Sequence, residues 1–89
     1  VEAVRAIFAT WQEGVPLQHR GPFRTHTLMT PVFSPPPSEW GPPPVVVGGL
    51  GPRMCEMAAE VADGLAVMPV TSERFFTERT LPAVQAGLA

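Results

Sequence analysis

A β-branched run that leads directly into a glycine-rich turn and a helix constrains this chain most. Residues 45–47 are all valine, which favours an extended strand, and glycines follow at positions 48, 49 and 51. Pro52 suits the first position of a helix, where no amide donor is needed. From there apolar residues recur at helical spacing, at Met54, Met57, Ala58 and Val61. The pattern predicts a strand buried on both faces, a tight turn, and a helix that ends at Gly64.

A second strand and helix are predicted after this unit. Residues 65–70 form another short apolar run. Ser72 is placed to cap the next helix, and Glu73 would lie favourably in its first turn, near the positive end of the helix dipole. Because Pro82 removes a backbone donor, we expect this helix to kink or restart near Thr80. The alternation of strand and helix indicates an α/β fold.

The first half of the chain has a different character. Apolar residues at Val4, Ile7, Phe8 and Trp11 predict an amphipathic helix over residues 1–13, ended by Gly14 and Pro16. Nine of the twelve prolines then fall within residues 15–44, so that segment is predicted to be an ordered loop. Within it, residues 25–29 have some extended character and are compatible with a short strand.

Charge and hydropathy exclude several classes of partner. The net charge is −2, and the chain has no lysine, so no basic field would attract nucleic acid or anionic lipid. No apolar run is long enough to span a bilayer, and no signal peptide is recognisable. With a single cysteine, these features lead us to expect a cytoplasmic protein. Because residues 1–89 begin with Val1 and end on a helical pattern, we also expect a piece of a longer reading frame.

The glycine turn is the candidate binding site. A turn that feeds a helix N-terminus brings free backbone amides and the positive end of the helix dipole together, and anions such as phosphate bind there. Glycines permit close approach of a phosphate oxygen, and some of them could adopt positive φ angles. Arg53 could add a charge, point to solvent, or pair with Glu56 or Glu60. The alternative is a turn that is merely tight.

Two nucleotide-binding motifs do not fit this turn. A dinucleotide fingerprint requires a third glycine where Met54 stands, and the second strand lacks the ribose-binding acid. The phosphate loop of nucleotide hydrolases requires a lysine, which the chain does not contain. Both classes are therefore excluded.

Other chemically capable residues have simpler interpretations. His19 and His26 have no partner at zinc-ligand spacing, so we predict no metal site, and His26 is either a loop residue or a substrate contact. Cys55 is expected to be a buried, inert thiol. The proline triplets at 35–37 and 42–44 are expected to stiffen a loop, although an aromatic groove could also recognise them.

The sequence resembles the luciferase-like monooxygenase family in two blocks, P-P-P-V-V-V-G-G-L-G-P-R-M at residues 42–54 and A-A-E-V-A-D-G at residues 58–64. Weaker matches, H-T-L-M-T-P at 26–31, T-S-E-R-F at 71–75 and T-L-P-A at 80–83, are most like its branch that uses the deazaflavin coenzyme F-420. The resemblance implies an α/β fold that is part of a TIM-like (β/α)8 barrel. Residues 1–89 would be a central fragment of that single domain, with two strand-helix units preceded by a helix and a proline-rich loop.

The resemblance also implies a function. The parent would be an oxidoreductase that passes hydride or electrons between F-420, or FMN, and a small organic substrate, and it could be a homo-oligomer. The cofactor-binding residues would be Gly48, Gly49, Leu50, Gly51, Arg53 and Met54, with the phosphate on the backbone of Gly49, Leu50 and Gly51 and with Arg53 and Met54 bordering the site. The substrate side would fall on Pro69, Val70 and Thr71. No residue here is a credible catalytic group, and the isolated fragment is expected to be inactive. The alternative is a non-enzymatic proline-rich interaction or scaffolding domain.

Overall fold

The computed structural model describes residues 1–89, which divide into two compact units, Val1–Pro43 and Pro44–Ala89. Each unit is described by itself. None of the helices combines the length and apolar character needed to cross a membrane.

The first unit begins with the predicted helix. Helix α1 (Glu2–Glu13) ends at Gly14, whose φ of 71° is left-handed and whose amide donates to the carbonyl of Thr10. Glycine adopts this conformation without the steric cost that a Cβ would add. The prediction that Gly14 ends the helix is therefore confirmed.

A small hairpin follows in the proline-rich segment. Strands β1 (His19–Arg20) and β2 (Thr25–His26) pair antiparallel, with His19 opposite His26 and Arg20 opposite Thr25. A single turn of 3-10 helix, η1 (Pro31–Phe33), comes next. The short strand expected within residues 25–29 is confirmed for its first two residues, whereas β1 was not predicted.

Side chains of α1 hold the loop that follows. The amide of Gln12 donates to the Ser38 carbonyl over 2.6 Å, and the Ser38 amide donates to Gln12 Oε1 over 2.9 Å. The indole Nε1 of Trp11 donates to the sulfur of Met29 over 3.3 Å. Ser38 lies between the two proline triplets, so these contacts agree with a stiff, ordered loop.

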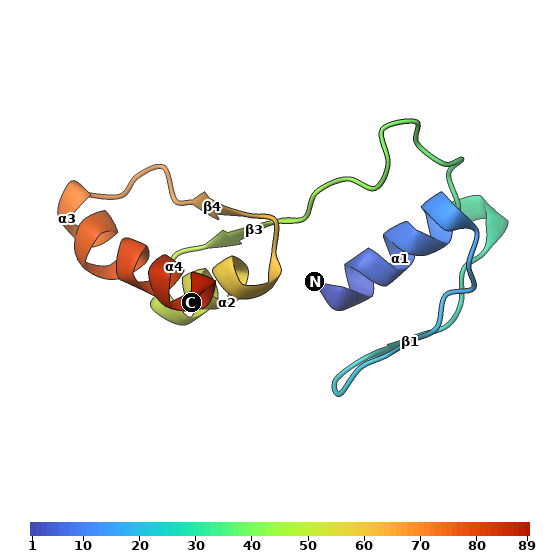
Figure 1. Ribbon diagram of the computed structural model, residues 1–89, viewed down its shortest axis with the longest axis horizontal. Helices are drawn as coiled ribbons and strands as arrows, with labels where there is room; N and C mark the ends of the chain where they lie inside the picture. Colours follow the sequence, from blue (N-terminus) through green and yellow to red (C-terminus); the bar gives the residue numbers. More distant parts are fainter. The chain divides into compact units, whose positions relative to one another are not determined.

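The second unit contains a parallel strand-helix-strand arrangement (Figure 1). Strand β3 (Val46–Gly49) pairs parallel with β4 (Gly64–Val67), and helix α2 (Pro52–Val61) connects them. The register places Val46 opposite Gly64 and Gly49 opposite Val67. The α/β class is thus confirmed, in a sheet of two strands.

Three predictions about this unit are wrong in detail. Gly64 does not end the helix; α2 ends at Val61 and Gly64 begins β4. Gly48 and Gly49 belong to the strand instead of the turn. The strand is not buried on both faces, because Val46 is 58% exposed in the two-stranded sheet. Apolar pattern alone does not distinguish a strand inside a larger sheet from one at the edge of a smaller one.

The last helical segment changes pitch where Pro82 requires it. Helix α3 (Glu73–Phe75) continues into the π-helical turn η2 (Phe76–Thr80) and then α4 (Leu81–Leu88). The Leu81 amide donates to the Phe76 carbonyl, five residues back, which is the π-helical spacing. The predicted break near Thr80 is therefore confirmed as a change of helix type.

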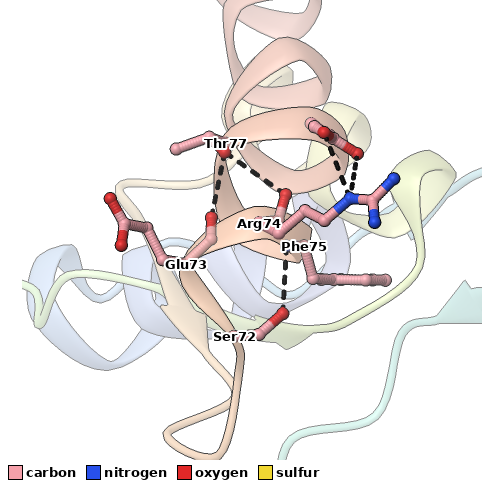
Figure 2. Close-up of polar contacts among 6 residues, drawn as sticks. Ser72, Glu73, Arg74, Phe75 and Thr77 are labelled. Carbon is pink, nitrogen blue, oxygen red and sulfur yellow. Dashed lines mark hydrogen bonds and ion pairs between the residues drawn. The ribbon is translucent and has the colours of Figure 1, made fainter.

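Ser72 caps this segment as predicted. Its Oγ accepts from the Phe75 amide over 3.1 Å, and Arg74 pairs with Glu78 one turn further on (Figure 2). Glu73 lies in the first turn. Helix α4 then packs on α2, with buried residues at the contact, namely Cys55, Ala58, Thr80 and Ala83.

Candidate functional site

The turn between β3 and α2 is built from extended backbone. Gly51 is the N-cap of α2 with φ −69° and ψ 150°, and neither Gly48, Gly49 nor Gly51 has a positive φ. The expectation that positive φ angles explain these glycines is wrong. Their role must lie in the space that a missing side chain leaves.

That space differs between the three glycines. A Cβ at Gly49 would lie 2.9 Å from Met54 Cγ and 3.3 Å from Leu65 Cδ1, so Gly49 allows Met54 to fold over the strand end. A Cβ at Gly48 or Gly51 would meet nothing within 4 Å. The backbone at these two positions is therefore open to a ligand.

Three backbone amides at the start of α2 have no partner in the protein. Those of Gly51, Arg53 and Met54 donate no hydrogen bond to another group of the chain, and Pro52 between them has no amide hydrogen. The first amide of the helix to find a partner is that of Cys55, which donates to Gly51 O over 3.0 Å. Unpaired amides at a helix N-terminus favour an anion.

An open depression adjoins these amides at the carboxyl ends of β3 and β4. Its volume is about 430 Å³, within the range of small-molecule pockets. Backbone and apolar side chains line it, from Gly48, Gly49, Leu50, Ala66, Val67, Met68 and Pro69. In parallel sheets with helical crossovers, the carboxyl ends of the strands are where ligands bind.

Arg53 and Met54 both lie exposed in the first turn of α2. Arg53 makes no ion pair with Glu56 or Glu60, so the alternative that it points to solvent is the one observed. Its guanidinium remains available to an anion at the turn.

Of the three substrate-side residues, one lines the depression. Pro69 lines the depression, whereas Val70 is 91% exposed and is not part of the lining. Thr71 donates its hydroxyl to the Met68 carbonyl over 2.7 Å, which fixes the loop after β4. Ala66, Val67 and Met68 line the depression but were not singled out from the sequence. Their position at the end of the second predicted strand was the available signal.

Cys55 is 0% exposed, and its thiol donates to the Leu50 carbonyl over 3.7 Å. The expectation of a buried thiol is confirmed. The contact also anchors the turn, because it ties the residue before Gly51 to the first turn of α2. Nowhere do three or more histidine, cysteine, aspartate or glutamate side chains come together to hold a metal ion.

Together these features are a parallel β-α-β unit with an anion-competent turn at the carboxyl ends of its strands. The chain belongs to the luciferase-like monooxygenase family, whose model matches residues 1–89.

Its curated relatives are mycobacterial. An uncharacterized protein of Mycobacterium tuberculosis strain H37Rv (Rv1360) and one of Mycobacterium bovis (Mb1395) are each 45% identical to it over 89 residues. The match covers the whole of this chain but 26% of each relative, so the chain spans about a quarter of their length. No solved structure matches the chain significantly.

Proposed function

We propose that this chain supplies the cofactor-phosphate turn of a luciferase-like oxidoreductase, which transfers hydride or electrons between a deazaflavin or flavin and a small organic substrate. The observation that carries the proposal is the set of three unpaired amides, at Gly51, Arg53 and Met54, beside a depression of about 430 Å³.

The donor set fits one phosphate group. Amide donors and the helix dipole favour a negative charge at this position, and the flexible side chain of Arg53 adds one positive charge. The absence of a side chain at Gly48 and Gly51 leaves room for phosphate oxygens to approach the backbone. Lysine, which other phosphate sites use, is not needed in this arrangement.

The apolar floor of the depression supports a second part of the proposal. Leu50, Val67, Met68 and Pro69 offer no charged group, so this surface suits an uncharged part of a ligand. The bound cofactor would supply the redox chemistry, while these residues would position it. Pro69, with Val70 and Thr71 after it, would then face the substrate.

We further propose that residues 1–89 are a central part of one (β/α)8 barrel domain in a longer, cytoplasmic protein. The parallel pairing of β3 and β4 through α2 supports this, as does the match to only 26% of the relatives. Two strands of such a sheet leave Val46 exposed, as expected if neighbouring strands complete it.

Between the two cofactors, we propose F-420 in preference to FMN. The support is the resemblance of residues 26–31, 71–75 and 80–83 to the F-420 branch. The test is a fluorescence titration of the full-length protein with each cofactor separately. We expect saturable one-to-one binding of F-420 and weaker binding of FMN. The reverse order would contradict the cofactor assignment, and saturation by neither would contradict the function.

A further inference from the structure

The hairpin of the first unit brings together the only two histidines of the chain. His19 on β1 and His26 on β2 are direct cross-strand partners, and their ring centroids are 6.2 Å apart with 23° between the planes. Both side chains are half-buried. Six residues lie between them in the sequence, a spacing that by itself suggests no shared site.

The ring nitrogens of both histidines are unengaged. Neither imidazole makes a hydrogen bond or an ion pair with the protein, although histidine nitrogens usually have partners that fix their tautomer. Gly21 provides room for one of the rings, since a Cβ there would lie 2.8 Å from His19 Nε2. The ring of His19 thus lies over the backbone of the hairpin, with a free nitrogen.

We propose that His19 and His26 form a two-histidine chelate for a borderline divalent ion of the zinc, nickel and copper class. Imidazole nitrogen is a preferred ligand of these ions. Two imidazoles that bind one ion, each at about 2.0–2.1 Å, have ring centres about 5–6 Å apart. The observed 6.2 Å between the stacked rings is close to that separation, and a rotation of the side chains would be required to turn one nitrogen of each ring toward a shared ion.

The charges around the pair set the strength of the site. Arg20 pairs with Thr25, so alternation along the strands places it on the opposite face from the histidines. Arg24 lies opposite Gly21, whose amide donates to its carbonyl, and the Arg24 side chain is exposed and free to turn into solvent. No carboxylate joins the pair, so water would complete the coordination. The expected site is weaker than a structural four-ligand zinc site.

Metal binding would also stabilise a weak element. Each strand has only two residues, and an isolated two-stranded hairpin is marginal in water. An ion held by both histidines cross-links the strands across the loop of residues 21–24. The two histidines belong to the first unit, whereas the turn before α2 belongs to the second.

The test is calorimetric titration of the full-length protein with Zn²⁺ and with Ni²⁺. His19→Gln, His26→Gln and the double variant are compared with Arg20→Gln, which changes only the opposite face. We expect each single histidine variant to lose about tenfold or more in affinity, because the second imidazole no longer acts at high effective concentration. The double variant should lose binding at this site altogether, because no protein ligand remains there. Gly21→Ala should also weaken binding by displacing His19.

Two results would overturn the proposal. One is a metal affinity that stays the same in both single histidine variants. That result would mean that the ion binds separate histidines or another part of the protein. The other is the absence of saturable binding in the unaltered protein. Histidine side-chain NMR of the unaltered protein uses no variant, so its result does not depend on whether the variants fold. During the metal titration, the signals of both rings must shift along one common curve.

Discussion

Close packing of helices α2 and α4 depends on the lack of a side chain at Gly87. A Cβ there would collide with the Glu56 carbonyl oxygen and lie 2.8 Å from the Ala59 Cβ. Helical propensity favours alanine over glycine by about 1 kcal/mol, whereas overpacking against backbone costs about 1–3 kcal/mol. The collision involves backbone that cannot rotate away, so we expect the packing cost to exceed the propensity gain.

Gly87→Ala should therefore lower the free energy of unfolding by up to about 2 kcal/mol, as measured by denaturant unfolding of the full-length protein. Gly48→Ala is the matched control, because its Cβ meets nothing within 4 Å and it should change stability little. If Gly87→Ala is as stable as the unaltered protein, the proposed contact between α4 and α2 is not as close as described.

Sequence reasoning located the residues of the turn but not the reason for their identity. Glycine at positions 48, 49 and 51 suggested positive φ, yet all three adopt backbone angles open to other residues. The three glycines differ in what surrounds the missing Cβ. Met54 and Leu65 lie close to that position at Gly49, whereas nothing lies within 4 Å of it at Gly48 or Gly51. Those neighbours come from tertiary packing, which local sequence does not specify.

At the scale of elements, the sequence predicted the beginnings and ends of helices correctly where the responsible residue acts on its close neighbours in the chain. Gly14, Pro52 and Ser72 each act through groups within a few residues of themselves, and each begins or ends a helix as predicted. Strand boundaries were less predictable, because β1 and the first residue of β4 are defined by pairing with distant residues. Gly64 is an example, since its place opposite Val46 makes it a strand residue.

The Ser72 cap gives a second prediction. Ser72→Ala removes the acceptor for the Phe75 amide and should cost about 1 kcal/mol of stability. Ser72→Asp keeps an acceptor at the same position and should retain that stability. Hydrogen exchange at the Phe75 amide is the direct readout, and equal exchange in the alanine and aspartate variants would show that the cap does not stabilise the helix.

At the scale of the whole molecule, little of the chain is buried. Only four hydrophobic residues are buried, Leu17, Cys55, Ala58 and Ala83, while Phe23, Leu28 and Trp40 are among many large side chains left exposed. A chain of this size buries a modest share of its surface even when compact. The exposed residues are consistent with further chain covering them in the longer protein that we propose.

The isolated 89-residue chain should therefore lack a cooperative unfolding transition and should associate in solution. Thermal circular dichroism and size-exclusion chromatography provide the measurement. A soluble monomer with a single cooperative transition would contradict this expectation and would favour the alternative of a small, self-contained interaction domain.

The central claim is that the amides beside Gly51 hold the phosphate of the cofactor. Aspartate and asparagine are isosteric, both are good N-cap residues, and both fit the φ of −69° and the open space at Gly51. Replacing Gly51 by each in turn therefore separates charge from shape, while Gly51→Ala controls for the added carbon.

The decisive measurement is the dissociation constant of F-420, or of FMN, for the full-length protein carrying Gly51→Asp or Gly51→Asn. We expect aspartate to weaken binding by at least about tenfold more than asparagine does, because a carboxylate repels a phosphate at contact distance. Equal affinities for the two variants would contradict phosphate binding at this turn.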